Sequence, residues 1–229
     1  MSALQKLLGL RSRPIAISFR SEAPEGVAHV SQGEPAGCGY WRRAAEGEVF
    51  YTVAGDHVSC PVGAHTHSVP LTDEQKKGLM GLVETMVGLE YLKMEDVAQI
   101  PTLPKPFEVA IYAPLEAAPL APDVVLVRGN ARQLMLLAEA AQSAGVSGAG
   151  PTMGRPTCSV IPEAVRSDTT SASFGCIGNR VYTGASDEDA YFAIPGDRLA
   201  TVEERLAVMV KANTELEKFH RSRLPVVSR

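Results

Sequence analysis

Several features that would assign this chain to a common class of protein are missing from its sequence. No apolar run approaches the roughly 20 residues that a membrane-spanning helix needs, and no block of lysine and arginine supplies the clustered charge that binds nucleic acid. The formal net charge is −4. The first 14 residues place leucines at helical spacing but lack the apolar stretch and cleavage site of a signal peptide. We therefore expect a cytoplasmic protein that binds neither membranes nor nucleic acid.

Familiar site motifs are missing as well. The chain has no Gly-x-Gly-x-x-Gly and no P-loop, so nucleotide binding has no direct support. It has no Cys-x-x-Cys knuckle, the usual mark of structural zinc, and no His-Glu-x-x-His helix. What remains as a source of chemistry is a set of four cysteines. Cytoplasmic thiols are usually kept reduced, which favours ligands or reactive groups over structural disulfides.

The pattern of apolar residues predicts an α/β fold in one domain spanning residues 1–229, with a mixed sheet flanked by helices; an α+β arrangement stays open. The run from Asp123 to Arg128 is nearly all apolar, as in a strand covered on both faces, and leads directly into a helix. Thr72 with Gln75, and Thr201 with Glu204, form capping boxes that start two other helices. The predicted strands are 15–19, 49–53, 107–112, 123–128, 171–174, 181–183 and 190–194, and the main predicted helices are 72–92, 131–141 and 201–220.

The cysteines form two pairs, Cys38 with Cys60 and Cys158 with Cys176, spaced 22 and 18 residues apart. They lie in segments rich in glycine and proline, which we interpret as loops. The second member of each pair leads into a glycine-containing turn. This echo suggests a degenerate internal duplication that places four sulfurs around one point. Buried, inert thiols are the alternative reading, since free cysteine is among the most buried residue types.

If the four thiols are ligands, an iron–sulfur cluster is the favoured cofactor, of the 4Fe–4S type, because its thiolates can come from distant loops. Zinc and haem are the alternatives, and a disulfide-forming redox pair is a further one. His57, Arg155 and Arg180 would then tune the cofactor or neutralise its negative charge. We expect the partner to be a small molecule or a redox protein. Whether the chain forms a homo-oligomer stays open.

Two other functions fit the same residues. Cys60 could be the nucleophile of a thiol enzyme, with His57 or His65 as its base, because a neighbouring imidazole lowers a thiol's pKa. Alternatively, the chain could be a non-catalytic module that binds a small ligand or haem. The sequence does not decide whether the protein is an enzyme.

The order of the motifs along most of the chain resembles the family called domain of unknown function 169. The resemblance rests on Gly37-Cys38-Gly39-Tyr40-Trp41, Phe50-Tyr51-Thr52, Asp56-His57-Val58-Ser59-Cys60-Pro61-Val62-Gly63, Ala113-Pro114-Leu115-Glu116, Pro122-Asp123-Val124-Val125-Leu126, Arg155-Pro156-Thr157-Cys158 and Gly175-Cys176-Ile177-Gly178-Asn179-Arg180. It implies that the four cysteines occupy the family's motif positions. It implies no activity and no particular cofactor.

Overall fold

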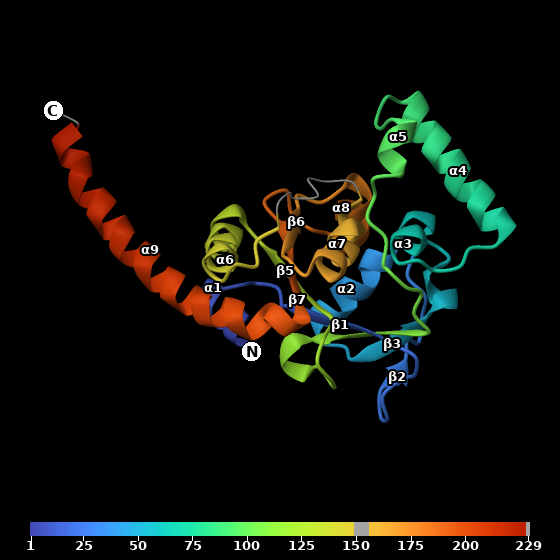
Figure 1. The fold of residues 1–229 in the computed structure, drawn as a ribbon, viewed down its shortest axis with the longest axis horizontal. Helices are drawn as coiled ribbons and strands as arrows, with labels where there is room; N and C mark the ends of the chain where they lie inside the picture. Colours follow the sequence, from blue (N-terminus) through green and yellow to red (C-terminus); the bar gives the residue numbers. More distant parts are fainter. Residues whose placement is uncertain (149–155, 228–229) are drawn as a thin grey trace.

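A single mixed sheet organises the computed structural model, which describes residues 1–148 and 156–227, with side chains as far as residue 223 (Figure 1). Within this part of the chain the sheet has seven strands in the order β2-β3-β4-β1-β5-β7-β6. All neighbouring strands run antiparallel except β2 and β3, which are parallel. The strands are β1 (Ile15–Arg20), β2 (Ala28–His29), β3 (Phe50–Val53), β4 (Val109–Pro114), β5 (Val124–Gly129), β6 (Ser171–Ser173) and β7 (Ala190–Pro195).

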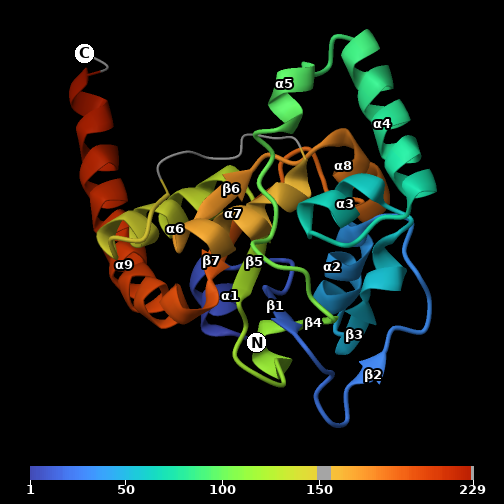
Figure 2. The same ribbon diagram turned by 45° about the vertical axis from the view of Figure 1, so that its right-hand side comes forward.

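Helices cover both faces of the sheet, so the predicted α/β fold is confirmed. One face carries α2, α3, α7 and α8, and the other carries α1, α6 and the first part of α9 (Figure 2). The helices are α1 (Ala3–Leu8), α2 (Gly37–Glu46), α3 (Pro61–Thr66), α4 (Asp73–Gly88), α5 (Met94–Val97), α6 (Ala131–Ser143), α7 (Val160–Ser167), α8 (Ile177–Thr183) and α9 (Leu199–Val227). None of the described helices is long and apolar enough to cross a membrane.

The burial of the central strand β5 explains why its sequence is apolar at successive positions and not only at alternate ones. Val124 and Leu126 pack into the core on the α2 and α7 side, whereas Val125 and Val127 pack into the core beneath α6 and α9. All four side chains have no exposed surface. The prediction of a strand covered on both faces is therefore confirmed.

The sheet consists of two halves with the same topology. In chain order, the first half has the strands β1, β3 and β4, and the second has β5, β6 and β7. In each half the first strand pairs with the last, and the last pairs with the middle one, giving the spatial orders β1-β4-β3 and β5-β7-β6. The register also repeats, because the first residue of the first strand faces the proline that ends the last strand: Ile15 faces Pro114, and Val124 faces Pro195. The strands β1 and β5 meet in the centre as an antiparallel pair.

A second detail repeats beyond the strands. After each of these prolines, the next backbone N–H donates to the carbonyl of the residue just before the half's first strand, at 2.8 Å in both halves: Leu115 to Pro14, and Gly196 to Asp123. The first cysteine of each pair lies between the first and middle strands, and the second follows the middle strand, after the 3-10 turn Ala54–His57 at Cys60 and after a short turn at Cys176. The topology thus supports the internal duplication suggested by the cysteine spacing.

Two predicted elements differ from the structure. The residues 181–183, predicted as a strand, form the end of α8. There the Thr183 hydroxyl donates to the Asn179 carbonyl at 2.7 Å, and Gly184 ends the helix at a left-handed φ of 62°. The β-branched residues Val181 and Thr183 favoured a strand in the sequence pattern. The hydrogen bond of Thr183 and the left-handed Gly184 instead make these residues the last turn of a helix. The last helix, predicted to end at residue 220, continues to Val227 and extends away from the body.

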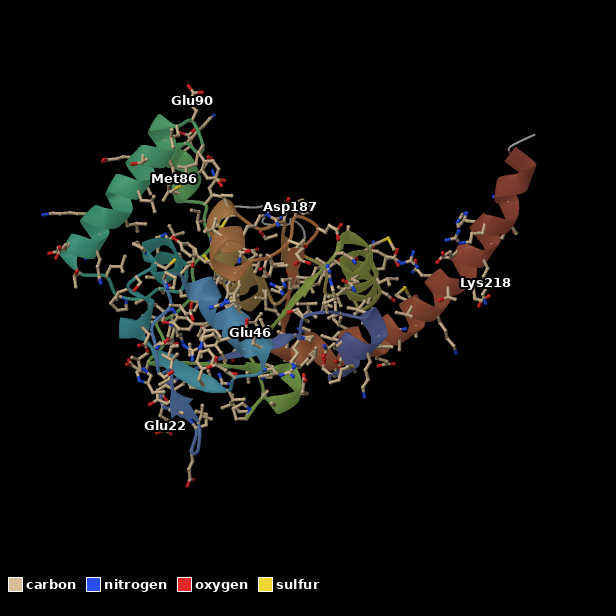
Figure 3. The ribbon with its side chains drawn as sticks, turned by 180° about the vertical axis from the view of Figure 1, so that it is seen from behind. Glu22, Glu46, Met86, Glu90, Asp187 and Lys218 are labelled. Carbon is tan, nitrogen blue, oxygen red and sulfur yellow. The ribbon has the colours of Figure 1, made fainter. Side chains whose placement is uncertain are left out.

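Two segments project from the body on opposite sides. One is the α4–α5 unit, on which Met86 and Glu90 are labelled in Figure 3, and the other is the outer part of α9 with Lys218. The predicted capping box of Thr72 and Gln75 starts α4. The helices that carry the cysteines lie between these projections, on the body itself.

Candidate functional site

The structure brings all four cysteines to helix starts on one face of the sheet. Cys38 is the second residue of α2, and Cys60 and Cys176 are the N-cap residues of α3 and α8. Cys158 lies in the 3-10 turn Thr157–Ser159 that leads into α7. The interpretation of these segments as plain loops was therefore wrong, most clearly at Cys38. Helix starts carry partial positive charge and so favour a thiolate over a thiol.

The packing of these short helices places the thiols near one another. The start of α2 packs against α3 and α8, and α3 packs against the 3-10 turn that carries Cys158. At Gly63 a Cβ atom would lie 3.0 Å from the Cys60 sulfur and 3.9 Å from the backbone nitrogen of Gly37. All four cysteines are free. The structure thus places thiols from both halves of the chain in one region, and their shared ligation of a metal stays a prediction.

The thiols are also coupled electrostatically. The pKa of Cys38 is raised to about 12, mainly by burial, and negative charge on Cys60 and Cys176 acts in the same direction. Burial likewise raises the pKa of Cys158 well above its usual range, with charge on Cys60, Cys176 and Cys38 adding to the effect. Without a cation, the site therefore holds Cys38 and Cys158 as neutral thiols. A bound cation would remove the cost of deprotonating them together.

The geometry of the thiols is looser than that of a ready-made metal site. Among the described residues, no group of three or more His, Cys, Asp or Glu side chains is arranged to hold a metal ion. Two observations nevertheless fit a bound group at the thiols. The donor set consists of four reduced sulfurs, and the Asn179 side chain beside Cys38 is buried with neither amide atom hydrogen-bonded to a described residue.

Polar groups from the neighbouring elements surround the sulfurs. The Thr66 hydroxyl donates to the Cys158 sulfur at 3.3 Å, and the Gly63 backbone N–H donates to the Cys60 sulfur at 3.4 Å. The Cys176 backbone N–H donates to the Thr157 hydroxyl oxygen at 2.6 Å. Hydrogen bonds of this kind orient thiolate ligands and tune a bound cluster.

His57 lies in the core below α2. Its Nε2 is 2.8 Å from the Thr52 hydroxyl, and its ring is 5.2 Å from that of Tyr40. The pKa of His57 is lowered to about 3, mainly by burial, with positive charge on His67 acting in the same direction. His57 is therefore neutral at physiological pH. It contributes to the site through its backbone, because its carbonyl accepts from the Cys60 N–H at 3.2 Å.

The side chains of His57 and His65, which we considered as bases for Cys60, are not hydrogen-bond partners of its sulfur among the described residues. Within the described part of the chain, no hydrogen bond joins the Cys60 side chain to His57 or His65. His65 is a partly exposed residue of α3. The only hydrogen bond of the Cys60 sulfur to a described residue comes from Gly63.

Arg155 and Arg180 were both predicted to neutralise the charge of the cofactor, and the structure describes only Arg180. The Arg180 guanidinium donates to three backbone carbonyls, at 2.6 Å to Phe174, at 3.3 Å to Asp189, and to Ser186. It therefore ties the turn before Cys176 to the segment after α8. Arg155 lies outside the described residues.

Sequence reasoning missed two side chains that contact the sulfurs, Thr66 and Asn179. Neither belongs to a residue type that marks metal sites. The only signal was position, since each follows the second cysteine of its pair by a few residues on the same short helix.

The comparison with known proteins gives one family and no closer relative. The model of the family described as domain of unknown function 169, uncharacterised ArCR, matches residues 3–205. The chain belongs to the DUF169 family. The match covers both halves of the sheet and all four cysteines, and ends within the first part of α9. No curated protein and no solved structure matches the chain.

Proposed function

We propose that this DUF169 protein holds a cysteine-ligated metal cofactor, most simply a 4Fe–4S cluster bound by Cys38, Cys60, Cys158 and Cys176. The observation that carries the proposal is the gathering of four free thiols from both halves at helix starts, where charge on the other thiols helps to raise the pKa values of Cys38 and Cys158. Helix starts and backbone N–H groups stabilise the negative charge of thiolate ligands.

A cluster fits the donor set better than a single zinc ion. The ligands come from four separate helix starts and have no Cys-x-x-Cys spacing, whereas structural zinc sites usually use such knuckles. A 4Fe–4S cluster would take four cysteine thiolates, which is the number that this chain supplies.

When bound, such a cluster supplies reversible one-electron transfer. The residues of this chain would hold it and control its access to water: Cys38 is buried, and Cys60, Cys158 and Cys176 are partly buried. The electron would come from, or pass to, a redox protein or a small molecule. The protein's own contribution would be to fix the four sulfurs and to limit their contact with water.

A cavity beside strands β6 and β7 is large enough for a small molecule. It has a volume of about 870 Å³ and lies between α6 and the strands β6 and β7. Its walls are largely apolar, with Leu134, Met135 and Phe174 on them, and Arg180 lies at one side. Cys176 lies between Phe174 and Arg180 in the chain, although no cysteine lines the cavity among the described residues. Concave apolar sites of this size are typical of small-ligand pockets.

Anoxic purification tests the proposal. The protein should be brown and carry about four iron and four sulfide per chain, as a cubane requires. Each of the four Cys→Ala variants should lose most of the iron and the visible absorption. Val146→Ala, which removes buried apolar surface on the opposite face of the sheet, is the matched control and should keep both.

Other outcomes would decide against the cluster. A colourless wild-type protein without iron or sulfide would refute it. In that case, one cysteine alkylated far faster than the others would support the thiol enzyme with Cys60. A Soret band would support haem binding instead.

A further inference from the structure

Two of the thiols, the buried Cys38 and the partly buried Cys158, each contact a polar side chain from the opposite half of the fold. Cys38 belongs to the first half and lies beside Asn179 of α8, in the second half. Cys158 belongs to the second half and accepts a hydrogen bond at 3.3 Å from Thr66 of α3, in the first half. These contacts therefore cross between the halves, as the duplicated topology allows.

The surroundings of Asn179 are unusual for a buried amide. The residue is 2% exposed, and neither its oxygen nor its nitrogen has a hydrogen-bond partner among the described residues. Such an amide costs stability unless a partner is supplied. A neutral thiol is a poor partner, whereas a thiolate sulfur is a strong acceptor for the amide N–H. The side chain is thus suited to the ligated form of Cys38.

Thr66 has one hydroxyl proton and three neighbours. Its oxygen is 2.9 Å from the Gly63 carbonyl, 3.0 Å from Nδ1 of His67 and 3.3 Å from the Cys158 sulfur. Nδ1 of His67 also lies 2.9 Å from the Gly63 carbonyl, so it carries the proton and donates there. The Gly63 carbonyl can accept from both groups, so the Thr66 proton can point at the carbonyl or at the sulfur, and a thiolate, as the stronger acceptor, would draw it to the sulfur.

We propose that Asn179 and Thr66 are paired positioning residues, donating to the thiolate sulfurs of Cys38 and Cys158 when these bind the metal cofactor. This inference rests on the proposed function. Donation to a ligating sulfur draws electron density away from the metal and favours the reduced form of a cluster. The two donors therefore raise the cluster's reduction potential, each from its own side.

The test uses variants that keep the shape and remove the donor. Asn179→Leu and Thr66→Val should each shift the midpoint potential of the bound cluster to more negative values, and the double variant should shift it further. Thr66→Ser keeps the hydroxyl and should return the potential to that of the wild type. Potentials equal to the wild-type value in both single variants and in the double variant would overturn the inference.

Stability separates this role from a purely structural one. Asn179→Leu removes an amide that has no hydrogen bond to a described residue, so the metal-free variant should melt at the wild-type temperature or above it. A structural role would instead lower the melting temperature and leave the potential unchanged.

Cobalt provides a readout that does not depend on the cluster. The metal-free wild type, titrated with Co²⁺, should show thiolate-to-cobalt charge-transfer bands, and these should move to lower energy in both donor-less variants. Bands that are present in the wild type but unmoved in the variants would refute this inference alone. A wild type with neither such bands nor iron would refute the proposed function, and the inference with it.

Discussion

The metal-free protein should lose much of its stability between neutral pH and pH 5 because it buries two neutral histidines. In the folded state the pKa of His57 is lowered to about 3 and that of His67 to about 4, in both cases mainly by burial, from a usual value of 6.5. Above about pH 6.5 both residues are neutral in the folded and unfolded chains, and they add no pH dependence. Below it, the unfolded chain binds protons that the folded chain excludes, so the free energy of unfolding falls with pH.

The magnitude follows from the difference between these pKa values. Between pH 6.5 and pH 5 the free energy of unfolding falls by about 1.4 kcal/mol per pH unit for each histidine. Each histidine therefore lowers it by about 2 kcal/mol at pH 5, and the two together lower it by about 4 kcal/mol. This result barely changes whether the folded pKa is 3 or 4, since pH 5 lies above both. Single domains are stable by only about 5–15 kcal/mol, so the loss is a large fraction of the total.

Urea unfolding at a series of pH values measures this loss. Trp41 is the chain's single tryptophan and is 2% exposed, so its fluorescence reports unfolding directly. In His67→Asn, whose amide nitrogen can replace Nδ1 as the donor to Gly63, the fall should shrink to about 2 kcal/mol. His220→Gln, on the exposed outer part of α9, is the matched control and should behave as the wild type. An unfolding free energy that stays constant between pH 7.5 and pH 5 would refute the reasoning.

Three substitutions test other parts of the structure. Gly63→Ala places a Cβ 3.0 Å from the Cys60 sulfur, so iron content should fall while circular dichroism stays that of the wild type; full iron content would contradict the crowding. Tyr40→Phe removes a hydroxyl that donates to a backbone carbonyl at 2.7 Å and should cost about 1–2 kcal/mol in urea unfolding, whereas an unchanged midpoint would argue against that hydrogen bond. In Gly196→Ala the new Cβ would overlap the backbone just before β5, so little folded protein should be recovered; normal yield and melting temperature would show that this close approach is absent.

Much of the fold follows from local sequence signals. The apolar run before Gly129 predicts β5, and the Thr72 and Gln75 pair predicts the start of α4. In both places the residues that decide the element are neighbours in the chain. The repeat was visible only through the cysteine spacing, because the equivalent strands share a register rather than a sequence.

The details of the site depended on contacts that a sequence pattern does not contain. Glycines near Cys38 and Cys176 indicated loops, but tertiary packing turns those segments into helix starts. The roles of Thr66 and Asn179 arise from helices of one half lying against thiols of the other, which no local spacing predicts. Neighbouring residues suggested that His57 tunes the cofactor or acts as a base, and the structure adds that it is buried and hydrogen-bonded to Thr52; both roles stay predictions.

X-ray absorption at the iron edge of the anoxically purified protein tests the central claim most directly, because it reports which atoms bind the metal. We expect iron surrounded by sulfur together with a short iron–iron distance, both lost in the Cys38→Ala and Cys158→Ala variants. Iron bound only by nitrogen and oxygen, or no iron at the edge, would contradict the claim.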